Sequence, residues 1–299
     1  MSVAHIPVMA AEVLEHLAPR EDGVYVDATA GLFGHTAAIA ARLGSGMVLA
    51  CDRDAESLEH GIQNAGAWAG RIRTARTSFS GLRETMDRLG IGMADGLVAD
   101  LGASRYQLTD PARGFSFMAD GPLDMRMDRS QSGTAAEIVN YSTETELANL
   151  LFDYGQERRA RKIARAIVRA RPIQSTLHLA RTVEQAAPRT SRLHPATQTF
   201  MALRIATNRE LEELESLLES LPRLVRAGGR IVIITFMSLE DRKVKRAFQN
   251  LAREGRVTIL TKHVVRPTRE EVLSNPASRS AKLRSVEVRE LGDFDGDSG

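Results

Sequence analysis

The sequence predicts an α/β protein with a mainly parallel sheet and a helical domain inserted into it. Short runs rich in β-branched and other apolar residues alternate with helical patterns over roughly the first hundred residues, as in strands joined by covering helices. The alternation then stops and resumes only at the apolar run 230–234. These two observations predict the sheet and the insertion.

Seven segments have the composition of strands, and two helical patterns separate the first three of them. The strands are expected at 24–27, 47–52, 72–75, 96–100, 230–234, 257–265 and 281–288, and the helices at 36–43 and 55–65. The last two strands are expected to form a closing hairpin.

About a hundred residues between the fourth and fifth strands exceed what one crossover needs, because a single helix can join two parallel strands. Residues 208–225 supply that helix, with leucines at helical spacing, and Gly228-Gly229 is predicted to end it. We therefore expect a discontinuous domain (1–104 and 206–290), an inserted helical domain for substrate recognition (105–205) and a disordered, acidic tail (291–299).

The composition is that of an ordinary globular enzyme. Apolar residues make up 43% of the chain, aromatic residues only 5%, and the net charge is +2. The single cysteine, Cys51, lies in an apolar run and is expected to be a buried thiol, so neither a disulfide nor a zinc site is expected. The sequence contains no signal peptide or membrane-spanning pattern, which favours the cytoplasm.

Polar residues and glycines follow the predicted strands, where ligands bind in open α/β sheets. Gly31 and Gly34 permit a tight turn after the first strand, and Asp52 ends the second, where a carboxylate can accept hydrogen bonds from ribose hydroxyls. The loop contains no G-x-G for a pyrophosphate and the chain no P-loop, so a phosphate-free nucleoside such as S-adenosylmethionine suits it better than a dinucleotide. An ordinary strand-to-helix turn with a capping Asp has the same local pattern.

Longer motifs are more specific, and together they resemble one family. They are Asp100-Leu101-Gly102, Arg113-Gly114-Phe115-Ser116-Phe117-Met118, the segment 120–128 (DGPLDMRMD), His194-Pro195-Ala196-Thr197, Ser238-Leu239-Glu240-Asp241-Arg242, Asn275-Pro276 and Leu283-Arg284. From about His5 to Arg289 the chain resembles the small-subunit (16S) ribosomal RNA cytidine-N4 methyltransferases, the MraW/RsmH family.

The resemblance implies a seven-strand, Rossmann-like class I methyltransferase fold that uses S-adenosylmethionine to methylate a cytidine N4 amine in ribosomal RNA or the small ribosomal subunit. It also implies a set of donor-binding residues: Phe33, Gly34, His35, Asp52, Phe79, Asp100 and Gln107. The sequence departs from the family pattern at three positions. Phe33 replaces the first glycine of Gly-Gly-His and is expected to narrow the donor pocket, Met237 replaces a histidine, and Arg105 replaces a serine.

Two groups of residues are candidates for catalysis and RNA binding. Asp100 is the candidate catalytic residue, because a carboxylate there can accept an N–H bond from the amine or orient the donor; the alternative is that it only caps the following turn. The run 158–171 contains seven basic residues and no acid. Five are expected to share one helical face towards RNA phosphates: Arg158, Arg161, Lys162, Arg165 and Arg169.

Other interpretations stay open at this point. Phe33 and Met237 are compatible with a non-catalytic or retargeted RNA-binding relative, and an NAD-type oxidoreductase would need the missing G-x-G motif. His194 is expected to be structural. Glu240, Asp241 and Arg242 fit a structural ion-pair group as well as a substrate contact. The sequence does not indicate an oligomeric state.

Overall fold

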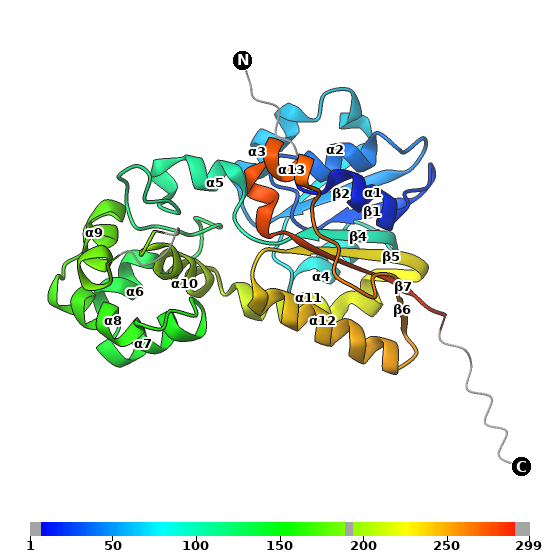
Figure 1. Cartoon of the computed structure of the whole chain (residues 1–299). Coiled ribbons are helices and arrows are strands. Elements are labelled where there is room, and N and C mark those ends of the chain that lie inside the picture. The colour runs from blue at the N-terminus through cyan, green and yellow to red at the C-terminus, as the bar shows by residue number, and fades with distance from the viewer. Residues whose placement is uncertain (1–6, 189–193, 291–299) are drawn as a thin grey trace, which may run out of the picture. The chain divides into compact units, whose positions relative to one another are not determined.

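The computed structural model describes residues 7–188 and 194–290 of the chain (Figure 1). The chain divides into two compact units, Met1–Gly102 with Glu213–Gly299, and Ala103–Glu212. The predicted disordered tail, 291–299, lies outside the described residues.

The first unit contains a seven-stranded sheet, which confirms the predicted fold class. Its strands are β1 (Val24–Asp27), β2 (Met47–Asp52), β3 (Ile72–Arg76), β4 (Ala94–Asp100), β5 (Val225–Thr235), β6 (Val257–Ile259) and β7 (Lys282–Val288). They lie in the order β3-β2-β1-β4-β5-β7-β6. The pairs among β1 to β5 are parallel, whereas β7 runs antiparallel to both of its neighbours. The last two strands therefore pair as expected, although β6 is shorter than predicted.

Helices cover both faces of this sheet because successive side chains of a buried strand point to opposite sides. On β4, Leu97 joins the core that contains residues of α4 (Leu82–Arg88), α11 (Glu210–Leu224) and α12 (Ser238–Arg253). The next residue, Val98, joins the core of α1 (Ala10–Leu17) and α2 (Gly34–Ala40). The remaining helical segments of this unit are α3 (Ala55–Asn64), η1 (Gly66–Arg71), α13 (Arg269–Ser274) and η3 (Pro276–Ser280).

The role expected for Gly228-Gly229 is wrong. Helix α11 ends at Leu224, and both glycines lie within β5. The pairing of β5 with β4 shifts register there: Val225 pairs with Ala94, whereas Arg230 pairs with Gly96. Gly228 has a φ of 74°, and a Cβ on Gly229 would lie 2.8 Å from the carbonyl oxygen of Asp95. The glycines therefore permit a bulge rather than cap a helix.

Within the described residues, the second unit contains helices and connecting loops but no strand. It comprises α5 (Arg105–Thr109), η2 (Pro111–Arg113), α6 (Ala135–Tyr141), α7 (Glu144–Asp153), α8 (Ala160–Arg169), α9 (Thr176–Ala186) and α10 (Thr197–Asn208). Thr134, Thr143 and Ser175 cap α6, α7 and α9 by accepting a backbone N–H. The unit has its own hydrophobic core, to which α6 to α10 all contribute. No helix in the described ranges is long and apolar enough to cross a membrane.

Candidate active site

Three carboxylates end three neighbouring strands of the sheet. Asp27 ends β1, Asp52 ends β2 and Asp100 ends β4, and β1 lies between the other two. Because the strands are parallel, these carboxylates lie at the same edge, the one where α/β proteins bind ligands.

Asp27 organises the loop that follows β1. Its carboxylate accepts hydrogen bonds from the Thr29 backbone N–H (3.2 Å) and the Thr36 hydroxyl (2.6 Å). The Thr29 hydroxyl in turn accepts the backbone N–H of Asp100 (2.6 Å). Burial raises the pKa of Asp27, which is fully inaccessible to solvent. Asp27 was not among the predicted site residues, although its place at a strand end was visible in the sequence.

His35 and Asp100 lie beside each other, and three of their polar atoms have no hydrogen-bond partner among the described residues. The Nε2 atom of His35 lies 3.5 Å from Oδ2 of Asp100, and the imidazole is only 5% exposed. The two groups attract each other electrostatically when the imidazole is protonated, but the contact does not have the geometry of a hydrogen bond. Among the described residues, both ring nitrogens and Oδ1 of Asp100 are buried without a hydrogen-bond partner. Burial lowers the pKa of His35, but the neighbouring Asp100 and Asp27 carboxylates outweigh that effect and raise it.

Buried polar atoms without partners are costly, so they point to a ligand that completes the site. Here three such atoms belong to Asp100, at the carboxyl end of β4, and to its neighbour His35, in the first turn of α2. This is the observation that best marks the site.

Asp52 holds the glycine loop from the side of β2. Its Oδ2 accepts the backbone N–H of Gly31 (2.8 Å), and its Oδ1 accepts that of Asp54 (2.9 Å). Asp54 caps α3 by accepting the N–H groups of Glu56 and Ser57. Burial raises the pKa of Asp52 to about 6, against its ordinary value of 3.8.

Phe33 lies in the core, and its expected effect on the donor pocket stays a prediction. Its φ is 68° and its ψ 27°, a left-handed conformation that costs a non-glycine residue about 1–2 kcal/mol. Its ring is only 2% exposed and belongs to a small cluster with Ala30, Ala50, Leu58 and Ala65. Burial of a Phe side chain contributes about 1.5–3 kcal/mol, which offsets that cost.

The other predicted donor residues have different surroundings. Phe79 follows β3 and is partly buried against the main core of the first unit. Gln107 belongs to the second unit, where its side chain and Ser104 form the capping box of α5. Met237 precedes α12, and its backbone N–H is bound by Glu240 (3.1 Å). Donor contacts of Phe79 and Gln107 remain predictions.

Most of the basic run forms an amphipathic helix as predicted, but α8 begins at Ala160, so Arg158 precedes the helix and does not lie on its face. Ala160, Ile163, Ala164 and Ile167 of α8 are buried, whereas the five basic residues named above are exposed. The sequence run contains no acid, but α7 supplies one: Glu144 pairs with Arg165 at 3.2 Å. Both groups of that pair are largely exposed, so its contribution to stability is small.

The remaining candidates have structural roles. His194 stacks on Phe117, with ring centroids 4.6 Å apart, and its Nδ1 accepts the N–H of Ala196. Asp241 pairs with Arg284 at 2.7 Å, while Glu240 accepts the N–H groups of Phe236 and Met237. Cys51 is buried as predicted, and burial raises the pKa of its thiol.

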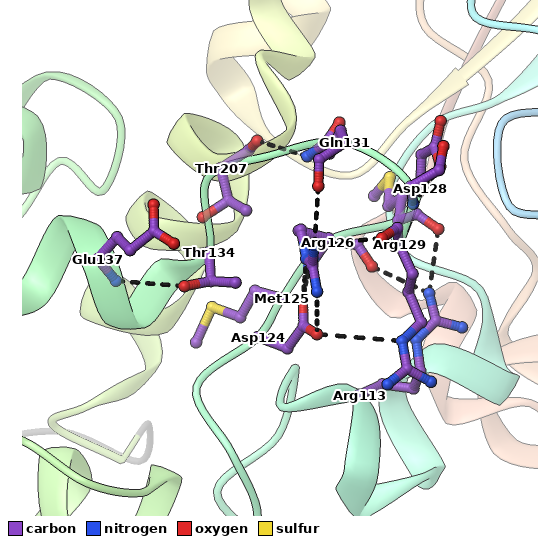
Figure 2. A network of polar contacts seen from close by, with 12 residues as sticks. Arg113, Asp124, Met125, Arg126, Asp128, Arg129, Gln131, Thr134, Glu137 and Thr207 are labelled. Atoms are coloured by element: carbon purple, nitrogen blue, oxygen red, sulfur yellow. Dashed lines mark hydrogen bonds and ion pairs between the residues drawn. The ribbon is translucent and has the colours of Figure 1, made fainter.

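The most specific motif, 120–128, lies in a loop that polar contacts hold from several sides. Figure 2 shows the Asp124 carboxylate facing the Arg126 guanidinium, which binds both carboxylate oxygens at 2.7 and 2.9 Å. The Arg126 guanidinium also donates to the carbonyl oxygens of Arg129 (3.1 Å) and Gln131 (2.7 Å). Burial raises the pKa of Asp124, but the Arg126 guanidinium outweighs that effect and lowers it.

Two buried side chains hold the same loop from elsewhere in the unit. Arg113, only 1% exposed, donates to the carbonyl oxygens of Arg126 (2.9 Å) and Met127 (3.1 Å). Asn208, at the end of α10, accepts the Met127 N–H and donates to the Met125 carbonyl, both at 2.7 Å. These contacts fix Met125 in a left-handed conformation, with a φ of 57°.

Comparison with known proteins identifies the family. The model of the MraW methylase family matches residues 2–289. The chain belongs to the MraW methylase family. The ribosomal RNA small subunit methyltransferase H of Solibacter usitatus is 58% identical to this MraW methylase, over 95% of the chain and 100% of that protein. The protein of the same name from Acidobacterium capsulatum is 46% identical, over 95% of the chain and 98% of that protein. Among solved structures, an rRNA methylase from Streptococcus thermophilus is similar with a TM-score of 0.44 and 11% identity, covering 94% of each chain.

Membership of this family confirms the predicted methyltransferase and its donor, S-adenosylmethionine, and excludes the oxidoreductase alternative. The residues present fit such a donor. It carries ribose hydroxyls and an amino-acid group, which can hydrogen-bond to carboxylates and to an imidazole. Asp52 and Asp100 offer acceptors at the strand ends, and the His35 imidazole on α2 offers further polar atoms beside them.

Proposed function

We propose that this MraW methylase transfers a methyl group from S-adenosylmethionine to the N4 amine of a cytidine in small-subunit ribosomal RNA. Family membership supports the reaction class, and the unpartnered atoms of His35 and Asp100 are the structural observation that carries the site. We place the reaction in the cytoplasm, on ribosomal RNA or the small ribosomal subunit.

The donor-binding residues we propose act as follows. Asp52 accepts hydrogen bonds from the ribose hydroxyls. Phe33 and Gly34 contact the donor through their backbone, and His35 also contacts it through its imidazole. Phe79 flanks the adenine, and Asp100 and Gln107 contact the polar groups. When bound, the donor supplies a methyl group on a positively charged sulfur.

Asp100 has the role closest to the chemistry in this proposal. The lone pair of the cytidine amine is delocalised into the ring, so the amine is a weak nucleophile and positioning can supply about 7–11 kcal/mol at best. The carboxylate of Asp100 accepts an N–H bond of the amine and thereby orients its lone pair. It also stabilises the positive charge that develops on the nitrogen and accepts the proton released afterwards.

We further propose that the inserted helical domain, expected at 105–205, binds the RNA through the exposed face of α8. Arg158, Arg161, Lys162 and Arg169 have no ion-pair partner within the described ranges, so their charges are available to phosphates. A target base must leave its stack to reach a pocket of this kind, and contacts to the flanking backbone hold it there.

The test is methyl transfer from labelled S-adenosylmethionine to small ribosomal subunits that lack the modification, followed by mass spectrometry of the nucleosides. We expect N4-methylcytidine. Donor binding without transfer to any subunit nucleotide would contradict the proposal, and a different methylated nucleoside would reject the N4 assignment alone.

A further inference from the structure

We propose that Phe33 is a positioning residue for donor binding, because its ring, seated on Gly61, fixes the loop after β1 against α3. This inference rests on the donor site proposed above. It gives a role to the one residue of the loop that departs from the glycine expected there.

The Phe33 ring packs closely against Gly61 of α3. A Cβ built on Gly61 would lie 2.5 Å from Cε1 and 2.8 Å from Cγ of Phe33. Real carbon atoms do not approach so closely without a shift, so the ring occupies the space that any other residue at position 61 would need. The two residues are therefore complementary: the ring requires a glycine on the helix.

The backbone of Phe33 is hydrogen-bonded to the residues on both sides of it. The N–H of Phe33 donates to the carbonyl of Ala30 (2.7 Å), and its carbonyl accepts the N–H of Ala37 (2.8 Å). Fixing Phe33 therefore fixes both the turn that contains Gly31 and the first turn of α2, which carries His35.

The same loop and helix contact the carboxylates of Asp52 and Asp100. Gly31 donates to Asp52, and His35 lies beside Asp100. The same helix on which the ring rests begins directly after Asp54, which also donates to Asp52. A displaced ring would thus disturb the groups that face the donor from β1, β2 and β4, without removing any of them.

The test compares Gly61→Ala with the double variant Phe33→Gly/Gly61→Ala. The added methyl group of Gly61→Ala must push the ring and loop away, and we expect the affinity for S-adenosylhomocysteine to fall about tenfold by calorimetry, which is the size of a moderate overpacking effect. Removing the ring in the double variant relieves the clash, and glycine accepts a positive φ. We expect Phe33→Gly alone to bind about threefold more weakly than the unmodified protein, because the loop loses its anchor on α3, and the double variant to match Phe33→Gly and bind better than Gly61→Ala.

Gly70→Ala is the matched control, because no atom lies within 4 Å of a Cβ built there. We expect its affinity and melting temperature to equal those of the unmodified protein. Melting temperatures of all variants give a readout that is independent of the donor. A lower melting temperature for Gly61→Ala with unchanged affinity would overturn the inference, as would a double variant that binds no better than Gly61→Ala.

Asp52→Asn separates this inference from the proposed donor site. If Asp52→Asn binds like the unmodified protein while Gly61→Ala binds weakly, the assignment of Asp52 is wrong and the role of Phe33 is supported. If Asp52→Asn binds weakly and Gly61→Ala normally, the donor site stands and the role of Phe33 is rejected.

Discussion

The strand-end cluster of the first unit (Asp27, His35, Asp52 and Asp100) and the 120–128 loop of the second are both polar and partly buried, but they differ in how their polar groups are satisfied. In the loop, the guanidinium groups of Arg113 and Arg126 and the amide of Asn208 all bind backbone or carboxylate oxygens of the same unit. In the cluster, His35 and one oxygen of Asp100 have no hydrogen-bond partner within the described part of the chain.

This difference distinguishes residues that stabilise the fold from residues that can bind a ligand. A saturated network stabilises one conformation and leaves little to offer a ligand, whereas unpartnered buried atoms lower stability unless a ligand binds them. The 120–128 motif thus stabilises its own unit. The strand ends have the properties of a binding site. Four experiments test this comparison.

The largest effect is expected for Asp100→Asn. The substitution keeps the shape of the side chain but removes the charged acceptor, and we expect turnover to fall about a thousandfold, equivalent to about 4 kcal/mol. The melting temperature should change little, because Oδ1 has no partner to lose. Single-turnover kinetics and thermal unfolding measure the two quantities. Undiminished turnover would reject the catalytic role, and the remaining role would be a turn cap.

Asn208→Ala should show the opposite behaviour. It leaves the Met127 N–H and the Met125 carbonyl without a side-chain partner, and we expect a loss of about 2–3 kcal/mol in the free energy of unfolding. Denaturant unfolding measures the loss. Donor affinity should stay unchanged, because the donor residues proposed on the strands are intact. If donor affinity fell as steeply as stability, the loop would also contribute to donor binding, and its purely structural role would be rejected.

The pH dependence of donor affinity tests the protonation state of the Asp52 carboxyl. The folded protein holds the Asp52 proton up to a pH of about 6, so the carboxyl is neutral below that pH. A neutral carboxyl is a weaker acceptor for ribose hydroxyls, and we expect affinity to fall about tenfold as the pH is lowered through about 6. Asp52→Asn should weaken binding at neutral pH and remove this step.

The stability of the fold depends on pH in the opposite direction to donor affinity. The fold without donor binds this proton more tightly than the unfolded chain does. It should therefore lose stability as the pH rises from 3.8 towards about 6, and Asp52→Asn should abolish that loss. A pH step of equal size in Asp52→Asn would assign the titration to another group, with His35 the first candidate.

The smallest effect is expected on α8. Arg161→Gln/Arg169→Gln removes two exposed charges, and the slope of log affinity for RNA against log salt should decrease by about 1–2. Arg253→Gln, an exposed arginine in the last turn of α12, is the control and should leave the slope unchanged. Filter binding over a salt series measures both. An unaltered slope in the double variant would show that α8 does not contact phosphate.

Much of the fold was predictable because its signals are local. The strands β1 and β2 have the predicted bounds, since short apolar runs ended by Asp are read directly from the sequence. The buried stripe of α8 likewise follows from helical periodicity alone. The predicted ends of the second and fourth strands also place Asp52 and Asp100 at strand ends, which the structure confirms.

What the sequence by itself determined is therefore the fold class, the family and the residue types at the strand ends. Only the tertiary structure decided that Phe33 points into the core, that Gly228-Gly229 form a bulge, and that Glu144 neutralises Arg165. Each of these depends on a partner distant in sequence: Gly61 for the ring, Asp95 for the bulge and a neighbouring helix for the arginine. Local patterns determine secondary structure and which face is apolar, but the contacts that satisfy a buried group, or leave it unsatisfied, arise only when distant segments fold together.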